Sequence, residues 1–262
     1  MIIFNGVSSD EIGVIVEHYP KVIFPKRKVE VYQIPGRNGD RIIDHEVYEN
    51  YDQPYEIFID SKDQGGLEAI VPKLASWLFS GNGYCRLEDS YFPEFYRMAY
   101  VPEAHEFLSY FNEYGRGTLT FNCAPERWYK SGDIEIEIQN GQTYHNPSGF
   151  KAWPLLRFSN AVNNFTFKHI NEPIANQIPP VGDIEYSQNI SFHYSGVHYL
   201  DPKEHAIYDY ISRTTDGKTY YDLYDESAKY TGEYDPFYLG KSTRITWDGT
   251  TNIYMKPRWW TV

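Results

Sequence analysis

The sequence predicts a mainly β protein with one short helix. Aromatic residues make up 18% of the 262 residues, and aromatic rings pack well on the pleated surface of a strand. The chain also contains 19 Gly and 16 Pro, which suit many turns between short strands. Apolar and polar residues alternate in many segments, as in strands that have one buried and one solvent-facing side.

The clearest alternation lies in two segments. In Thr118–Cys123, the residues Leu119, Phe121 and Cys123 share one face. In residues 133–138 every isoleucine points one way and every acid the other, which predicts a half-buried strand. Further strand patterns cover Lys28–Ile34, Tyr55–Asp60, Asn164–Ile170, Ile190–Tyr194, Lys218–Tyr224 and Thr243–Trp247.

A helix is predicted over Gly66–Phe79, where apolar residues recur at spacings of three and four. Pro72 interrupts this stripe, and since proline is tolerated mainly in a first turn, the regular helix is expected to begin near Val71. Gly81 and Gly83 then end it. A weaker helical pattern covers Lys203–Ile211.

Turn residues gather between Cys123 and Gly149 and mark a domain boundary. We place it so that the isoleucine segment opens the second domain, which gives domains of residues 1–132 and 133–262. Asn140-Gly141 lies between two strand patterns, which is a hairpin signal.

The charge balance argues against sequence-specific nucleic-acid binding. Acids outnumber bases 36 to 24, the formal net charge is −12, and the sequence has no long basic run. A negative surface would suit a conduit through which DNA slides. No segment approaches the roughly 18 continuous apolar residues of a membrane span, and the N-terminus does not look like a signal peptide.

No convincing active site, cofactor site or metal site emerges from the sequence. The glycines of Gly36–Asp40 and Ser80–Gly83 lack the context of a phosphate loop, and the eight histidines are scattered without a metal-binding spacing. An acidic run at 222–235 fits a solvated loop, with a glycoside hydrolase as the alternative. Cys85 and Cys123 are expected to be reduced thiols, with a single bridge as the alternative.

Tryptophan offers a second functional reading. Trp153 and Trp247 fall in the predicted second domain, where exposed indoles can stack on sugar rings. The other reading places them in the core or in subunit contacts. A carbohydrate-binding module for a bacterial wall glycan is therefore the alternative function.

Several short motifs follow one another along the chain. Gln33–Asp40 contains a Pro-Gly-Arg-x-Gly turn, and Leu74–Leu78 ends the predicted helix in Trp-Leu. Further motifs are Tyr96–Val101, Phe121–Tyr129 and Lys256–Val262. In this order the motifs resemble those of the distal tail protein family of siphophages, whereas residues 171–243 depart from the family's pattern.

The resemblance implies an N-terminal β-sandwich with one short helix and an extended hairpin arm, followed by a C-terminal galectin-like β-sandwich. It implies a homohexamer, as one ring or two stacked rings, with DNA passing through the centre. Partners would be the tail tube, a tail-associated lysin or tail-tip protein, and receptor-binding or baseplate proteins. The location would be the virion tail tip, after assembly in the host cytoplasm.

We expect the interlocking arm to be the hairpin whose turn comprises Pro35, Gly36, Arg37, Asn38, Gly39 and Asp40. The glycines permit backbone angles that a side chain would forbid, and strand patterns flank the turn on both sides.

Overall fold

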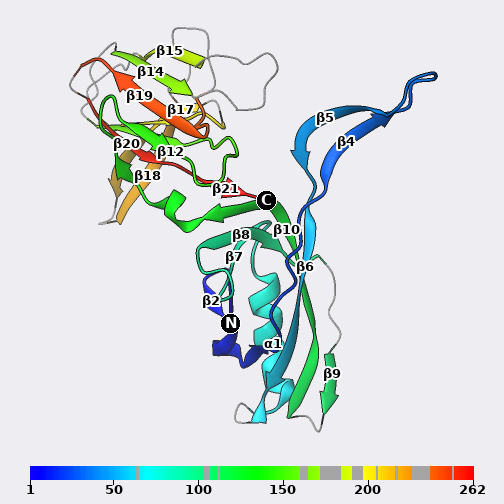
Figure 1. Ribbon diagram of the computed structural model, residues 1–262. Helices are drawn as coiled ribbons and strands as arrows, with labels where there is room; N and C mark the ends of the chain where they lie inside the picture. Colours follow the sequence, from blue (N-terminus) through cyan, green and yellow to red (C-terminus); the bar gives the residue numbers. More distant parts are fainter. Residues whose placement is uncertain are drawn as a thin grey trace. The chain divides into compact units, whose positions relative to one another are not determined.

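The chain folds into two compact units, residues 1–128 with Val262 and residues 129–261. A computed structural model describes residues 1–62, 65–102, 107–110, 113–159, 165–171, 184–190, 197–204, 206–215, 218–225, 237–249 and 251–262 (Figure 1). The mainly β class is confirmed. The predicted boundary between residues 132 and 133 falls inside a 3-10 turn, η3 (Lys130–Asp133).

The first unit is a curled antiparallel sheet packed on one helix. Its strands are β1 (Ile2–Phe4), β2 (Val7–Ser8), β3 (Val14–Val16), β4 (Arg27–Tyr32), β5 (Arg41–Tyr48), β6 (Tyr51–Asp60), β7 (Cys85–Asp89), β8 (Phe95–Tyr100), β9 (Phe107–Tyr110) and β10 (Tyr114–Tyr129). The sheet order is β2-β1-β7-β8-β10-β6-β3, with β9 paired to the start of β10. Strands β4 and β5 form a separate hairpin. A 3-10 turn, η1 (Ser9–Ile12), precedes β3.

The core of the first unit follows the alternation of its long strands. The predicted inward face of β10 is confirmed, because Leu119, Phe121 and Cys123 are fully buried. On β6 the residues at alternate positions from Tyr51 to Ile59 are also buried. Trp77 of the helix is buried, and its indole nitrogen donates to the carbonyl of Phe4 at 3.1 Å.

The predicted helix is α1 (Leu67–Phe79), the one α-helix among the described residues. It begins at Leu67, so the expectation that regular helix starts near Val71 was wrong. Pro72 lies inside the helix and is exposed to solvent. Ile70 lies before the proline and Leu74 and Leu78 lie after it, and all three are buried in the core. This tertiary packing stabilises the helix by more than the proline destabilises it.

The second unit is a sandwich of two antiparallel sheets. Its strands are β11 (Ile136–Glu137), β12 (Thr143–His145), β13 (Leu155–Ser159), β14 (Phe165–Asn171), β15 (Ile184–Ile190), β16 (Val197–Asp201), β17 (Ala206–Thr215), β18 (Lys218–Asp225), β19 (Ser242–Trp247), β20 (Asn252–Lys256) and β21 (Trp260–Thr261). One sheet has the order β11-β20-β13-β16-β17-β18, and the other β12-β19-β14-β15. Phe158 of the first sheet meets Phe167 of the second edge-on at 6.4 Å, so the two sheets share one core.

Two local predictions for the second unit were wrong. The isoleucine segment at 133–138 contains only the two-residue strand β11, and Ile134 is exposed to 61%. The weak helix over Lys203–Ile211 is largely the strand β17, which pairs with β16 and β18. Of the strand expected at Ile190–Tyr194, Ile190 is the last residue of β15, and residues 191–194 lie outside the described residues.

No helix within the described ranges is long and apolar enough to cross a membrane.

Candidate functional site

The most distinctive feature of the first unit is the β4–β5 hairpin, here called the arm (residues 27–48). Its strands pair from Tyr32↔Arg41 to Val29↔Asp44, with a bulge before Arg27↔Tyr48. Every residue of β4 is exposed, as is every residue of β5 except the half-buried Tyr48. The arm therefore contributes nothing to the core of its own unit, and Figure 1 shows it extending from the first unit.

The arm ends in the glycine-containing turn expected from the sequence. The amide of Arg37 donates to the carbonyl of Ile34 at 3.2 Å, and Gly36 has a φ of +80°. A type II turn favours proline at its second position and requires a positive φ, usually from glycine, at its third. Gly39 also has a positive φ, of +81°. The turn thus reverses the chain without help from the rest of the unit.

The two faces of the arm differ in chemistry. On one face Glu30 accepts a hydrogen bond from the Tyr32 hydroxyl at 2.5 Å and lies 3.0 Å from Nε2 of His45. These hydrogen bonds hold the pKa of the Glu30 carboxyl below its usual range, and the hydrogen bond from Tyr32 has the larger effect. The opposite face presents Val31 and Ile42, which are 55% and 64% exposed. An exposed aliphatic face on a two-stranded hairpin is the kind of surface that another protein covers.

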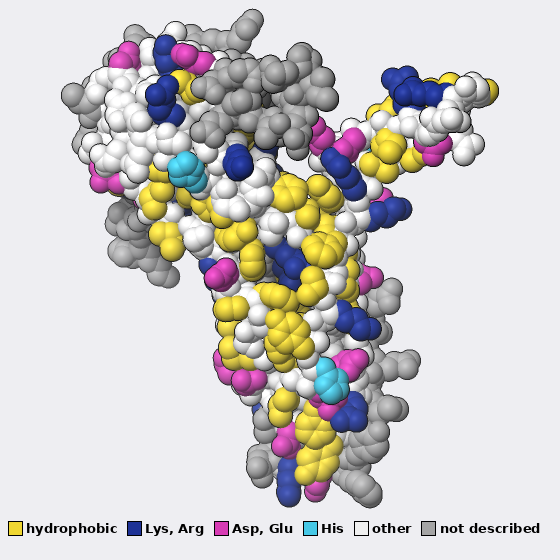
Figure 2. Space-filling model, viewed as in Figure 1, with side chains coloured by type: hydrophobic (Ala, Val, Ile, Leu, Met, Phe, Trp, Pro, Cys, Tyr) yellow, Lys and Arg dark blue, Asp and Glu magenta, His cyan; other side chains and the backbone are white. Residues whose placement is uncertain are grey.

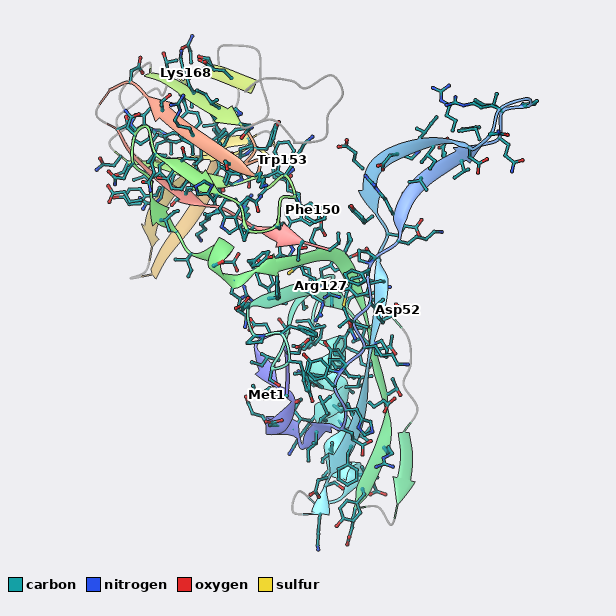
Figure 3. All side chains as sticks on the ribbon, in the orientation of Figure 1. Met1, Asp52, Arg127, Phe150, Trp153 and Lys168 are labelled. Carbon is teal, nitrogen blue, oxygen red and sulfur yellow. The ribbon has the colours of Figure 1, made fainter. Side chains whose placement is uncertain are left out.

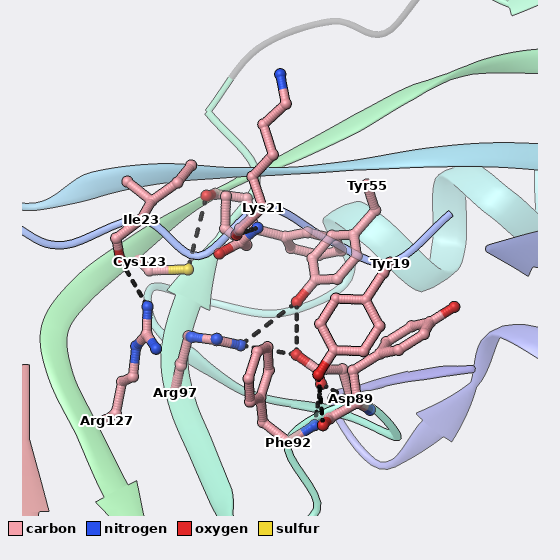
Figure 4. A network of polar contacts seen from close by, with 12 residues as sticks. Tyr19, Lys21, Ile23, Tyr55, Asp89, Phe92, Arg97, Cys123 and Arg127 are labelled. Carbon is pink, nitrogen blue, oxygen red and sulfur yellow. Dashed lines mark hydrogen bonds and ion pairs between the residues drawn. The ribbon is translucent and has the colours of Figure 1, made fainter. Parts of the chain in front are cut away.

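A buried polar network lies inside the first unit (Figure 4). Asp89 receives hydrogen bonds from Nη1 of Arg97 at 2.9 Å and from the Tyr55 hydroxyl at 3.0 Å. Its other carboxylate oxygen accepts the amides of Tyr91 and Phe92. Burial and the nearby carboxylate hold the pKa of the Tyr55 hydroxyl well above its usual range. The network fixes the loop after β7 to the centre of the sheet.

A second buried arginine, Arg127 of β10, lies close to the same network (Figures 3 and 4). Its Nη2 donates to the carbonyl of Ile23 at 2.6 Å. Its guanidinium faces the rings of Phe24 at 5.8 Å and of Tyr51 and Phe92 at 6.0 Å. Nearby, the ring of Tyr19 packs edge-on against those of Tyr91 at 4.8 Å and Phe92 at 5.7 Å.

Sequence reasoning missed this arginine pair as a unit. Arg97 and Arg127 each lie inside a segment that carries the family resemblance, but no role follows from that. The alternation of the strands could have revealed it. Arg97 lies two residues before the inward-facing Ala99, and Arg127 four residues after the inward-facing Cys123, so both arginines are on the inward face. A charged residue at an inward position of an alternating strand indicates either a buried ion pair or an interface.

Both tryptophans suggested for glycan stacking are half-buried. Trp247 packs against the core of the second unit, and its indole nitrogen donates to the carbonyl of Thr251 at 3.0 Å. Trp153, labelled in Figure 3, meets Tyr238 edge-on at 5.8 Å. Among the described residues no hydrogen bond or ring contact joins the two tryptophans, and glycan stacking stays a prediction.

The remaining sequence hypotheses concern the acidic run, the metal ligands and the two cysteines. Asp222 and Asp225 belong to β18, while Glu226, Glu233 and Asp235 of the acidic run lie outside the described residues. No group of three potential metal ligands comes together within the described ranges. Cys85 and Cys123 are buried free thiols, as expected from the sequence, and do not form the alternative bridge. Burial raises the pKa of the Cys123 thiol to about 12.

A further hollow of about 470 Å³ lies beside the helix and is lined by Val7, Ile12, Pro72, Lys73 and Trp77 among others. It is open to solvent and contains no cluster of catalytic groups.

Comparison with known proteins places the fold. No family model and no curated protein sequence matches this chain. Among solved structures, the chain is similar to the Dit protein of SPP1, described as a paradigm of the hub adsorption apparatus in phages that infect Gram-positive bacteria. The TM-score is 0.66 at 12% sequence identity, and the match covers 97% of this chain and 96% of that one.

Two structures of the phage P2 baseplate in its activated conformation, with Ca and with Sr, match with TM-scores of 0.46 and 0.44. Both are 8% identical and cover 93% of this chain and 90% of the other.

The chain is thus a β protein of two units with an exposed arm. Over nearly its whole length it has the fold of a phage distal tail protein, so the resemblance seen in the sequence is confirmed at the level of the fold.

Proposed function

We propose that this chain is a structural hub of a long-tailed phage tail tip, and that it acts by self-assembly without catalysis. The observation that carries the proposal is the fold match, which spans both units and leaves almost no part of either chain unmatched. The exposed arm supports it, because a hairpin with aliphatic residues on one face needs a partner surface.

In this proposal six copies form a ring, single or stacked in pairs, through contacts of the first unit. A ring arises when each copy meets the next through two different surfaces at a fixed angle. The arm, with its turn at Pro35–Asp40, is one of those surfaces. The ring joins the tail tube to a tail-associated lysin or tail-tip protein and to receptor-binding or baseplate proteins.

The charge of the chain agrees with a passage for DNA through the ring. A net charge of −12 gives little attraction for phosphates, so DNA would pass without being held. The proposed site of action is the virion tail tip. We also propose that the second unit is a galectin-like β-sandwich.

Light scattering over a concentration series, with negative-stain images of the same sample, tests the proposal. We expect a species near six times the 30.7 kDa chain, seen as a ring with a central hole. A strict monomer at every concentration, also in the presence of purified tail tubes, would count against it.

Deleting residues 35–40 tests the arm itself. Because these residues lie outside the core, the deletion variant should keep the wild-type melting temperature and remain monomeric. Rings formed by this variant would show that the arm assignment is wrong. Replacing Gly141-Gln142 of the second unit by Ala-Ala supplies a turn variant that should still assemble.

A further inference from the structure

Arg127 has less compensation for its charge than its burial requires. It is 7% exposed, and its Nε has no hydrogen-bond acceptor among the described residues. Arg97, 3% exposed, is paired with Asp89, but Arg127 forms no ion pair within the described part of the chain. The thiol of the neighbouring Cys123 is neutral, because burial raises its pKa to about 12.

A buried guanidinium without a carboxylate is costly, because its desolvation is only partly offset by one carbonyl and by aromatic faces. An acceptor from outside the chain would remove that cost. In protein interfaces, arginine and aromatic residues are frequent among the few residues that contribute most to the binding energy.

Exposed aromatic rings lie beside Arg127, although Tyr51, which also faces it, is buried. We define the aromatic patch as Tyr19, Phe24, Tyr91 and Phe92. Phe24 and Phe92 face the Arg127 guanidinium, and Tyr19 packs on Tyr91 and Phe92. Phe24 is 68% exposed although its ring faces Arg127, and Tyr19 is 62% exposed although its ring packs on Phe92. Figure 2 shows hydrophobic side chains over the face of the first unit and along the arm. The patch is therefore an apolar surface with one buried, uncompensated positive charge.

The arm has the complementary chemistry. Val29 faces Asp44 and Val31 faces Ile42 across the ladder, so the three aliphatic side chains lie on one face. Asp40, at the end of the turn, is an arm carboxylate that forms no ion pair among the described residues, whereas Asp44 is paired with Arg27. The arm thus offers aliphatic residues for the rings and a carboxylate for Arg127.

Within one chain the arm does not cover the patch, because both surfaces are exposed in the same molecule. A second copy can supply the arm while its own patch receives the next one. Such a contact uses two different surfaces and is the kind that closes into rings.

We propose that the aromatic patch around Arg127 is the receiving surface for the arm of a second copy of this chain. The inference rests on the proposed self-assembly and adds to it the surface that the arm contacts. The aliphatic face of the incoming arm covers the rings, and an arm carboxylate pairs with Arg127.

Photo-crosslinking of the full chain tests this contact, with p-benzoylphenylalanine in place of Phe24. Irradiation should join two chains, and mass spectrometry should place the link between position 24 and residues 27–48. The same photoreactive residue in place of Phe79, a phenylalanine of α1 that is 54% exposed, is the matched control and should give no link to the arm. Links from position 24 to any other segment, or no link, would overturn the inference.

The result separates this inference from the proposed function. Rings whose position 24 links to another segment would leave the hub proposal standing and refute the receiving surface. Open dimers or chains that link position 24 to the arm would support the receiving surface and refute the ring.

Arg127→Met distinguishes an interface role from a structural one. Because methionine removes an uncompensated buried charge, the melting temperature of the dilute chain should stay equal or rise, while self-association weakens by about tenfold or more. Arg86→Met is the matched control, since Arg86 stacks on Tyr96 at 3.7 Å but has its own partner in Glu88. A lower melting temperature with unchanged association would show that Arg127 serves only the fold.

Discussion

At the scale of single residues, Asp89 organises the interior of the first unit. One side chain accepts hydrogen bonds from Arg97, Tyr55 and two backbone amides, and it supplies the counter-charge to a guanidinium that is 3% exposed. The loss of stability depends on whether one or both partners of such a pair are removed. Loss of one partner leaves an uncompensated charge, whereas loss of both can be nearly neutral.

Asp89→Asn should therefore lower the free energy of unfolding by about 3–5 kcal/mol, measured by urea denaturation. The double variant with Arg97→Met should recover much of this loss. Glu94→Gln, a change at an exposed acid of the same loop, should have little effect. Equal losses in the single and double variants would show that the pair is not what stabilises this region.

His169 makes the second unit sensitive to acid. It is fully buried beside Phe237, at 4.6 Å between ring centres, and burial lowers the pKa of its imidazole to about 3. In the unfolded chain a histidine titrates near pH 6.5. Between these two values the unfolded chain binds a proton that the folded chain does not, so stability is full above pH 6.5 and falls as the pH drops toward 3.

The expected loss from this residue is at most about 1.4 kcal/mol per pH unit. Urea denaturation at pH 7 and pH 5 should show a smaller loss in His169→Gln than in the wild type. If the variant and the wild type lose equal stability over this range, another group is responsible.

At the scale of elements, the arm shows how far local sequence can specify structure. The turn forms from Pro35, Gly36 and Gly39 because proline fixes one backbone angle and the glycines supply two others. A Cβ atom at Gly36 would meet nothing within 4 Å, so any effect of a side chain there acts through the backbone alone.

Gly36→Val should disorder the turn and weaken self-association, while the melting temperature stays within a degree or two because the arm lies outside the core. Hydrogen exchange of the arm amides and light scattering measure the two effects. Gln33→Val, close to the turn but without a positive φ, is the control. A large fall in the melting temperature would show that the arm supports its own unit.

The segment at 133–138 shows where local sequence fails. Its alternation fits a strand, but a Cβ atom on Gly132 would lie 2.5 Å from the backbone nitrogen of Trp259, and the amide of Arg258 donates to the Gly132 carbonyl at 2.9 Å. This close approach of two distant backbone segments holds the start of the segment in the turn η3. Strand pairing therefore begins only at Ile136.

The Asn140-Gly141 signal failed in a related way. Gly141 has the positive φ of a turn, of +85°, but the flanking strands β11 and β12 belong to different sheets. The dipeptide reverses the chain between the two layers of the sandwich and does not close a hairpin. Sequence specified the turn, and the competition between possible strand partners decided which strands it joins.

At the scale of the whole molecule, the net charge of −12 opposes assembly of like copies. Repulsion between chains falls when salt screens it, whereas the aliphatic and aromatic contacts proposed here do not weaken in moderate salt. Raising NaCl from about 50 to 500 mM should therefore favour the assembled species, since the Debye length falls over this range.

Light scattering of the same sample at the two salt concentrations measures this effect. Dissociation at the higher concentration would show that exposed ion pairs, and not apolar burial, hold the copies together. The chain with residues 35–40 deleted should not respond to salt.

The sequence by itself determined the mainly β class, the buried face of β10, the helix and the glycine turn of the arm. All of these depend on residues close together in the chain, through periodicity or through the angles that proline and glycine impose. The ordered motifs also indicated the fold that the comparison with SPP1 Dit supports.

Only the tertiary structure decided which partner each polar and apolar group received. It made 206–215 a strand by placing β16 and β18 beside it, and it paired Asp89 with Arg97 while leaving Arg127 among aromatic rings. The physical reason is that strand pairing and counter-charges come from segments far away in the chain, and a local pattern contains no information about which distant segment will arrive.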